Sequence, residues 1–270
     1  MRRNALKILA VSNQKGGVGK TTTAINLGTA LAAMGEKVLV IDSDPQGNAS
    51  TGLGVPPQAR KLTAYDVLME DVSVASATVE TAVPGLDLLP SESDLSGIEL
   101  ELGAKPRRAY RLRDALTPVR AEGRYSWALI DCPPSLNLLT LNAMAAADSV
   151  LVPLQCEFFA LEGLSQLMHT IELVKNAHNT GLTIQGVVLT MYDRRNTLSK
   201  QVASDVRAYL GDKVYETMIP RNVRVSEAPG FGKPVLIYDL ECAGSQAYID
   251  LAKELLARER GRAKAEAVNG

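Results

Sequence analysis

The sequence predicts an α/β protein in which helices cover both faces of a doubly wound, mostly parallel β-sheet. Two observations predict this fold. Short aliphatic runs alternate with longer segments of helical pattern along the chain. Several of these runs are almost continuously apolar, as strands are when helices bury both of their faces. No repeat or low-complexity segment divides the 270 residues, so we expect one domain over residues 1–260 and a polar, disordered tail over 261–270.

The expected strands and helices follow in a regular order. Strands are expected at KILAVSN, KVLVIDSD, LDLLPS, WALIDCP, SVLVPLQ, IQGVVLTMY and KVYETMIP, which are residues 7–13, 37–44, 86–91, 127–133, 149–155, 184–192 and 213–220. Helices are expected over residues 21–34, 136–147, 161–177, 200–210 and 244–260. Pro56, Pro57 and the stretch GAKPRR mark surface loops inside the domain. Because strands and helices alternate, the connections are expected to be right-handed crossovers.

The composition narrows the class of protein. Lys and Arg number 29 and Asp and Glu 30, so no global field draws the chain to nucleic acid or anionic lipid. The three cysteines show neither metal-ligand spacing nor a disulfide framework, which suits a reducing cytoplasm. We expect no secretory leader, and no apolar run approaches the ~20 residues of a membrane span. Binding to nucleic acid must therefore come from a local patch.

The stretch SNQKGGVGKTTT, residues 12–23, joins the first strand to the first helix and is typical of a phosphate-binding loop. Its glycines let successive N–H groups turn inward as an anion nest, and the helix N-terminus adds its positive dipole. Lys20 is placed to neutralise the β- and γ-phosphates of a nucleotide. The Thr21 hydroxyl is placed for Mg²⁺, and Thr22 can donate to the α-phosphate. The predicted nucleotide-binding residues of this loop are Lys15, Gly16, Gly17, Val18, Gly19, Lys20, Thr21 and Thr22.

The loop departs from the common pattern G-x-x-x-x-G-K-[ST], because Gln14 stands where the first glycine is expected and Lys15 adds a second lysine. The stretch KGGVGKTT resembles the deviant Walker A box of the ParA/MinD group of P-loop ATPases. In that group the signature lysine reaches across a dimer interface to the phosphates bound by the other subunit. The resemblance implies that Lys20 serves the nucleotide of its own subunit and that Lys15 serves the partner's.

Aspartates end two of the expected strands. Asp42 and Asp44 lie two residues apart and share a face, and Asp131 ends WALIDCPP, which reads as a Walker B strand. Parallel strands of this fold class open toward the ligand crevice at these ends. The resemblance implies that Asp42 and Asp131 hold the water shell of Mg²⁺ together with Thr21, and that Asp44 orients the attacking water. The predicted reaction is in-line hydrolysis of ATP, in which Lys15, Lys20 and Asp44 act by positioning and charge neutralisation.

The resemblance extends from Lys7 to about Leu256 and favours one branch of the group. The stretches DPQGNAS, IDCPPSL, VPLQCEFFALEGL and IPRNVRVSEAPGFGKPV are similar to those of chromosomal, Soj-type ParA proteins. This likeness implies that Pro220 and Asn222 flank the adenine. It also implies an ATP-dependent sandwich homodimer, association with the nucleoid, and slow hydrolysis until a ParB-like centromere-binding partner stimulates it.

A basic segment offers a surface for DNA. Residues 194–233 hold eight Lys and Arg against four Asp and Glu, a surplus of +4 in a chain whose net charge is −1. Such a patch fits salt-sensitive contact with the phosphates of double-stranded DNA, and with few aromatics and no recognition helix it predicts no base readout. The candidate DNA-binding residues are Arg194, Lys200, Arg221 and Arg224.

Two other classes share the nucleotide motifs. A MinD-like membrane-positioning ATPase needs a C-terminal amphipathic membrane helix. Here the apolar stripe that contains Tyr248, Leu251 and Leu255 begins well inside the domain, so we expect it to pack onto the sheet and expect no membrane partner. An electron-transfer ATPase like the nitrogenase iron protein needs cysteines that face across a dimer. Cys132 follows Asp131 directly, but the other cysteines lie in unrelated contexts.

Overall fold

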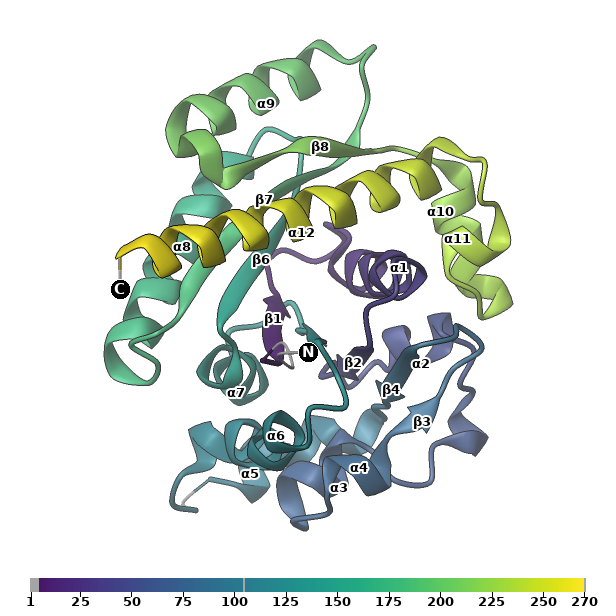
Figure 1. Cartoon of the computed structure of the whole chain (residues 1–270), viewed down its shortest axis with the longest axis vertical. Helices are drawn as coiled ribbons and strands as arrows, with labels where there is room; N and C mark the ends of the chain where they lie inside the picture. Colours follow the sequence, from purple (N-terminus) through teal and green to yellow (C-terminus); the bar gives the residue numbers. More distant parts are fainter. Residues whose placement is uncertain (1–4, 104, 270) are drawn as a thin grey trace.

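The computed structural model describes residues 5–103 and 105–269, with side chains through residue 262. In this part of the chain eight strands form one sheet in the order β3-β4-β2-β5-β1-β6-β7-β8 (Figure 1). Neighbouring strands are parallel, except that β3 is antiparallel to β4, so the predicted fold class is confirmed. The strands are β1 Lys7–Val11, β2 Val38–Asp42, β3 Val79–Glu80, β4 Leu86–Leu89, β5 Trp127–Asp131, β6 Ser149–Gln155, β7 Thr183–Tyr192 and β8 Val214–Pro220.

All five predicted helices are present, as α1, α7, α8, α9 and α12. The helices are α1 Lys20–Ala33, α2 Asn48–Gly52, α3 Ala64–Met69, α4 Val74–Ala77, α5 Ile98–Glu101, α6 Arg111–Glu122, α7 Leu138–Ala146, α8 Ala160–Ala177, α9 Thr197–Leu210, α10 Val223–Glu227, α11 Val235–Tyr238 and α12 Ala243–Asn269. Helix α6 was not predicted, and it contains Pro118, a residue that usually interrupts a helix. Its buried Leu112, Leu116 and Val119 hold it against the sheet.

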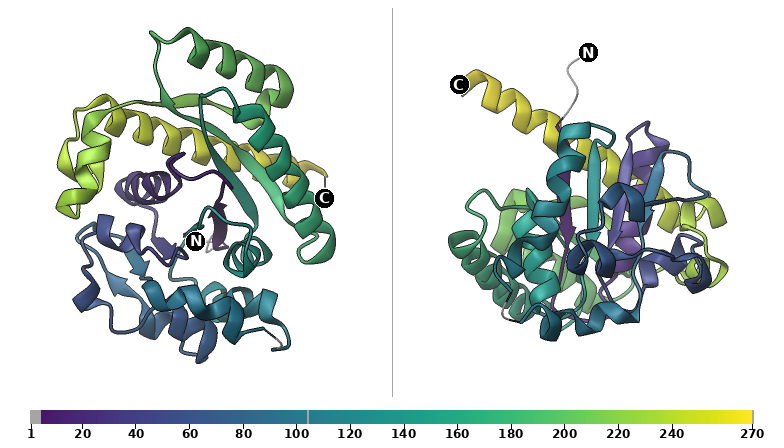
Figure 2. Two further views of the ribbon diagram at one scale, coloured as in Figure 1. Left: turned by 180° about the vertical axis from the view of Figure 1, so that it is seen from behind. Right: turned by 90° about the horizontal axis from the view of Figure 1, so that it is seen from below.

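Two hydrophobic cores lie on the two faces of the sheet. Ile8 and Ala10 of β1 belong to the core covered by α3 to α9, whereas Leu9 between them belongs to the core covered by α1, α2, α11 and α12. The two helical layers are visible in Figure 1 and, from behind, in Figure 2. Both faces of the central strands are therefore buried, which explains their continuous apolar sequences.

Helix α12 is longer than the sequence predicted. It continues through residue 269, whereas the sequence predicted a polar, disordered tail from residue 261. The Arg262 guanidinium donates to the side-chain oxygen of Gln185 on β7 at 2.6 Å, which ties this part of the helix to the sheet. Ala, Arg, Lys and Glu are frequent in the segment and favour a helix even without an apolar stripe. The last turns project beyond the body of the domain (Figure 2, right), and residues 1–4 and 270 lie outside the described residues.

The strand order brings the carboxyl ends of β1, β2 and β5 together. Strand β5 pairs with both neighbours, and its last residue, Asp131, is in register with Val11 and with Asp42. From β1 the chain crosses to β2 on one side, and from β5 it crosses to β6 on the other, so β1 lies where the strand order reverses. Doubly wound sheets bind ligands in the crevice at such a point.

Candidate nucleotide-binding site

The phosphate loop, defined here as residues 12–19, joins β1 to α1 with a backbone that glycine permits. Gly17 has φ 75° and Gly19 has φ 90°, both in the left-handed region where other residues are strained. Gly19 is the N-cap of the 14-residue helix α1 and provides no side-chain cap, so the first N–H groups of the helix remain available to another acceptor. Glycines and a helix N-terminus in this arrangement suit anionic oxygens.

The two lysines of the loop occupy different environments. Lys20 is 7% exposed, and its Nζ donates to the carbonyl oxygen of Lys15 at 3.0 Å. Burial lowers the pKa of Lys20, and the negative charge of Asp131 opposes that shift. The Lys15 side chain is 46% exposed, and its ammonium forms an ion pair with Glu157 in the loop before α8. Lys20 is thus buried within the chain, whereas Lys15 lies at the surface.

Side chains that the sequence did not single out hold the loop against the sheet. Thr190 on β7 donates its hydroxyl to the carbonyl oxygen of Val18 at 2.8 Å. Asn13 Nδ2 donates to the carbonyl oxygen of Pro153 on β6 at 2.8 Å. These partners lie far apart in the chain, so only the strand order reveals them.

Asp42 and Asp131 lie side by side at the ends of β2 and β5, and both are fully buried. Asp42 Oδ2 accepts from the backbone N–H and the hydroxyl of Ser50, at 2.8 and 2.7 Å. Burial raises the pKa of Asp42 to about 6, and the hydrogen bonds from Ser50 limit the shift. Burial and the neighbouring Asp42 raise the pKa of Asp131 well above its usual range.

The Asp131 carboxylate indicates what the site can hold. Neither of its oxygens has a hydrogen-bond partner among the described residues, and a buried carboxylate without one is unfavourable unless a cation or its water shell meets it. The Thr21 hydroxyl is close enough to lower the pKa of this carboxyl. In the described part of the chain no three acidic, His or Cys side chains converge as a direct metal site. The residues present therefore fit a cation held largely through its own waters, as Mg²⁺ often is.

Asp44 begins the loop between β2 and α2. Its Oδ1 accepts the N–H of Gln46 at 3.0 Å, and its own N–H donates to Asp42 Oδ1 at 3.3 Å. Its carbonyl oxygen accepts the N–H of Gly47 at 2.9 Å and the hydroxyl of Ser91 at 2.8 Å. Asp44 therefore lies in a tight turn beside Asp42, at the edge where the sequence predicted it.

Pro220 and Asn222 lie at the same end of the sheet. Pro220 ends β8 in register with Tyr192 of β7, two residues beyond the Thr190 that contacts the phosphate loop. Asn222 is the N-cap of α10, and its Oδ1 accepts the N–H of Arg224 at 2.9 Å. The helix cap occupies the side-chain oxygen of Asn222, so a base edge would have to meet its amide nitrogen or the neighbouring backbone.

Two of the four candidate DNA-contacting residues meet in a hollow of about 860 Å³. Arg194 and Arg221 line it together with Arg195, and the backbone N–H of Arg221 donates to the carbonyl oxygen of Tyr192 at 3.1 Å. Lys200 is exposed on the first turn of α9 and does not line the hollow. The structure therefore brings two of the candidates together on one surface.

Arg224 differs from the other three candidates. Its guanidinium lies 3.1 Å from a carboxylate oxygen of Glu227 and 3.3 Å from one of Asp239. Two acids of this chain thus partly neutralise its charge, which the linear charge count did not reveal.

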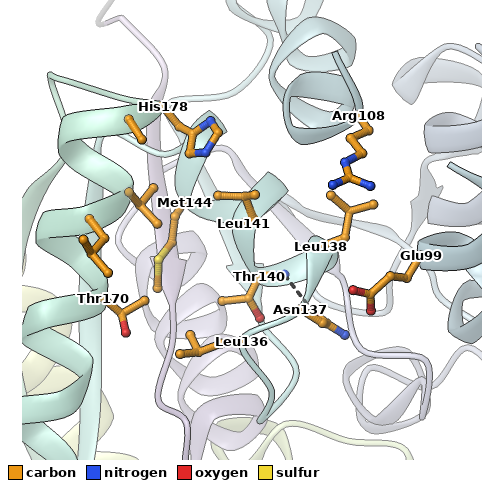
Figure 3. A pocket seen from close by; sticks show the side chains of 13 residues that line it. Glu99, Arg108, Leu136, Asn137, Leu138, Thr140, Leu141, Met144, Thr170 and His178 are labelled. Carbon is orange, nitrogen blue, oxygen red and sulfur yellow. Dashed lines mark hydrogen bonds between the residues drawn. The ribbon is translucent and has the colours of Figure 1, made fainter. Parts of the chain in front are cut away.

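A mainly apolar groove of about 470 Å³ lies between α7 and α8 (Figure 3). Leu141 and Met144 come from α7, and Thr170 comes from α8. Thr170, which lines the groove, is linked to the phosphate loop, because its hydroxyl accepts from Gln14 Nε2 at 3.2 Å. None of its lining residues is a predicted nucleotide-binding residue, so the groove is separate from the predicted nucleotide site at the strand ends.

The cysteines and the C-terminal helix bear on the two other classes, the electron-transfer ATPase and the membrane-positioning ATPase. Cys132 and Cys156 are buried and Cys242 is half-buried, and each follows a different element. Among the described helices, none is both long enough and apolar enough to cross a bilayer. The stripe formed by Tyr248 and Leu251 of α12 is buried against α1 and β8, which confirms that it packs onto the domain.

Known proteins resemble this chain over most of its length. A family model described as an AAA domain matches residues 6–184. The chain is 69% identical over 262 residues to the chromosome partitioning protein ParA of Caulobacter vibrioides, which covers 97% of this chain and 98% of that relative. It is 51% identical over 251 residues to the sporulation initiation inhibitor protein Soj of Bacillus subtilis, with 93% and 98% covered. It also resembles the crystal structure of cobyrinic acid a,c-diamide synthase from Mycobacterium smegmatis with a bound ATP analogue and magnesium. The TM-score is 0.82 at 38% identity, and the match covers 94% of this chain and 96% of the other.

Proposed function

Because the chain belongs to the ParA/Soj family of chromosome-partitioning ATPases, we propose that it is an ATP-driven switch that moves DNA. ATP with Mg²⁺ joins two copies into a sandwich dimer, and the dimer binds double-stranded DNA without sequence preference. Hydrolysis dissolves the dimer and releases the DNA. A ParB-like centromere-binding partner stimulates the slow hydrolysis, so that repeated cycles at the nucleoid segregate chromosome or plasmid origins.

The observation that carries the proposal is the unpartnered, buried carboxylate of Asp131 beside the phosphate loop. A hydrated Mg²⁺ bound to ATP would meet this carboxylate through water, with Asp42 on the next strand and the Thr21 hydroxyl nearby. The glycine-rich turn and the α1 N-terminus would hold the phosphates. Mg²⁺ would neutralise charge on the phosphate oxygens, and Asp44 would orient the water that attacks.

The surface position of Lys15 supports the proposed dimer. Its side chain is half-exposed, and among the described residues its ammonium pairs with Glu157 alone, so a modest rearrangement would free it to reach a second subunit. Lys20, in contrast, is buried where it can serve only its own nucleotide. Two lysines in one loop thus receive separate roles, one on each side of the interface.

The hollow that Arg194 and Arg221 line supports the proposed contact with DNA; Asp193, which pairs with Arg195, and Asp250 line it too. Arg194 and Arg221 share one surface, and Lys200 is exposed on α9 nearby in the chain. Dimerisation would place two such surfaces on one particle, and the effective concentration of the second would raise the affinity for DNA. Loss of the dimer would therefore release the DNA even if each contact were unchanged.

A MinD-like function on membranes is the alternative, since the nucleotide motifs are shared. The buried stripe of α12 argues against it, because the apolar side chains that a membrane helix would expose pack onto α1 and β8. Flotation with anionic vesicles in the presence of ATP separates the two proposals, because only the membrane ATPase would float.

Sedimentation of the Asp44→Ala variant tests the proposed switch. With ATP and Mg²⁺ the variant should form a stable dimer that co-sediments with duplex DNA, and with ADP it should remain monomeric and free. Turnover should be lost while ATP binding is kept, because Asp44 is assigned to the attacking water rather than to the phosphates. A variant that stays monomeric with ATP, or that no longer binds it, contradicts these assignments.

A further inference from the structure

Ser91, just beyond the end of β4, connects the two aspartates of the β2 edge. It is fully buried, and its hydroxyl donates to the carbonyl oxygen of Asp44 at 2.8 Å. Its backbone N–H donates to the hydroxyl of Ser50 at 3.1 Å. That hydroxyl in turn donates to Asp42 Oδ2 at 2.7 Å. One serine therefore contacts the main chain of Asp44 directly and the carboxylate of Asp42 through Ser50.

Arg60 fixes this serine from the far side. Its Nη1 donates to the carbonyl oxygen of Ser91 at 2.9 Å. Its Nη2 donates to the hydroxyl of Thr51 at 2.8 Å, and Nε and Nη2 both reach the carbonyl oxygen of Val55, at 3.0 and 2.9 Å. The guanidinium thus ties the end of α2, the helix that carries Ser50, to the strand end that carries Ser91.

The arginine is unusual because it is 9% exposed and forms no ion pair with any described carboxylate. A buried cation is costly unless its donors are satisfied, and four hydrogen bonds to neutral oxygens satisfy it here. A lysine could not replace this planar fork, because its donors radiate from a single atom.

The turn after Asp44 is shaped to the guanidinium. Gly47 has φ 62°, and a β-carbon at this position would overlap Arg60 Nη1 and lie 2.8 Å from the carbonyl oxygen of Ser91. The glycine is thus required both by its backbone conformation and by the close approach of the arginine. Arg60, Ser91 and the Asp44–Gly47 turn form one packed unit.

From this network we infer that Ser91 and Arg60 are positioning residues for ATP hydrolysis, acting through Asp42 and Asp44 without touching the nucleotide. Ser91 fixes the main chain from which the Asp44 side chain projects, and Arg60 fixes Ser91. The inference rests on the proposed ATPase function. It predicts a selective effect: loosening the network should slow the chemical step, which depends on placement of the attacking water, more than it weakens ATP binding.

Ser91→Ala is the sharpest test, because it removes the hydroxyl that holds Asp44 and leaves both backbone bonds of Ser91 in place. Ser96→Ala is the matched control. Ser96 lies five residues after Ser91 on an exposed turn, and its hydroxyl also donates to a carbonyl oxygen, that of Ser93, at 2.7 Å. With Mg²⁺ and ATP, Ser91→Ala should lower kcat about tenfold and change KM for ATP by less than about twofold. Ser96→Ala should leave both constants unchanged.

Amide hydrogen exchange of the nucleotide-free protein supplies a readout independent of turnover. The N–H of Gly47 donates to the Asp44 carbonyl, and that of Ser50 donates to Asp42. Both amides should exchange roughly tenfold faster in Ser91→Ala, because the bond to Asp44 no longer opposes local opening. Unchanged exchange, or equal loss of kcat in Ser96→Ala, overturns the inference.

Arg60→Lys tests the second member and keeps the positive charge. It should lower kcat with little change in KM, and normal kcat in a folded Arg60→Lys protein overturns the role of the fork. A fall in ATP affinity that matches the fall in kcat, in either variant, means that the network shapes the nucleotide pocket as a whole and also overturns the inference. If the wild-type protein hydrolyses no ATP, the proposed function fails, whereas the exchange experiment still decides whether Ser91 holds the Asp44 turn.

Discussion

Replacing Asp42 by asparagine is expected to stabilise the nucleotide-free protein at neutral pH. Burial raises the pKa of Asp42 to about 6, whereas its ordinary value, expected in the unfolded chain, is 3.8. The folded protein therefore keeps a proton on this carboxyl at pH values where the unfolded chain has lost it. The resulting stability is fully present below about pH 4 and is lost as the pH rises through about 6.

The magnitude follows from the same shift. Moving from 3.8 to about 6 corresponds, at about 1.4 kcal/mol per pH unit, to about 3 kcal/mol of unfolding free energy lost when Asp42 ionises. Asparagine keeps one oxygen for the two bonds from Ser50 and forfeits the 3.3 Å contact with the Asp44 N–H, which costs about 1 kcal/mol. The net gain at neutral pH is thus about 2 kcal/mol. The gain also includes an effect on Asp131. The charge of Asp42 raises the pKa of Asp131, and asparagine removes that charge.

Urea unfolding of the nucleotide-free protein, in the presence of a chelator, measures this gain. Asp42→Asn should be less stable than the wild type by about 1 kcal/mol at about pH 4, where only the lost contact counts, and more stable by about 2 kcal/mol at about pH 7.5. Asp212→Asn, at an exposed position, should stay within about 0.5 kcal/mol of the wild type throughout. The reasoning is refuted if Asp42→Asn is the less stable protein at pH 7.5, or if both proteins lose the same stability between the two pH values.

Three further outcomes are expected. Lys15→Ala should bind ATP but fail to dimerise in sedimentation, whereas Glu157→Gln should dimerise at least as well as the wild type and change the unfolding free energy by less than about 1 kcal/mol, because the ion pair is half-exposed. Arg221→Ala should lower the salt slope of DNA binding by about one, and Arg224→Ala should lower it less, because two acids already pair with Arg224. Leu251→Ala should lower the free energy of unfolding, measured in urea, by about 2–5 kcal/mol, because Leu251 is a buried core residue. If Leu251 faced a membrane, the substitution would instead change flotation with vesicles.

The layers of the fold and the position of the phosphate loop could be predicted because they depend on local patterns. A continuous apolar run such as WALID predicts a strand that is buried on both faces. A glycine-rich loop between a strand and a helix predicts a phosphate-binding loop. Asp42 and Asp131 were also predictable, since the ends of parallel strands meet at one edge of the sheet. Each of these inferences needs only neighbouring residues and the direction of a strand.

What could not be predicted depends on partners distant in the chain. Nothing in the sequence around Ser91 shows that its hydroxyl lies against Asp44, and an isolated Arg60 in a loop reads as a solvated charge. The pairing of Arg224 with Asp239 likewise depends on how α10 packs beside the segment that leads to α12. The helical path of α12 beyond residue 260 agrees with the helix propensity of its residues, to which the prediction gave less weight than to their polarity.

The buried carboxylates connect the pH dependence of the stability of the nucleotide-free protein to its proposed ligand. Asp42 and Asp131 are costly when charged and unaccompanied, and a bound Mg²⁺–nucleotide complex would offset that cost in the folded state alone. The carboxylates are more fully ionised at high pH, so the stabilisation given by Mg²⁺ and ATP should grow as the pH rises through about 6. The charges that lower the stability of the nucleotide-free protein are therefore the same charges that would favour its complex with Mg²⁺ and ATP. A site built from neutral donors would bind a nucleotide without this coupling between pH, metal and stability.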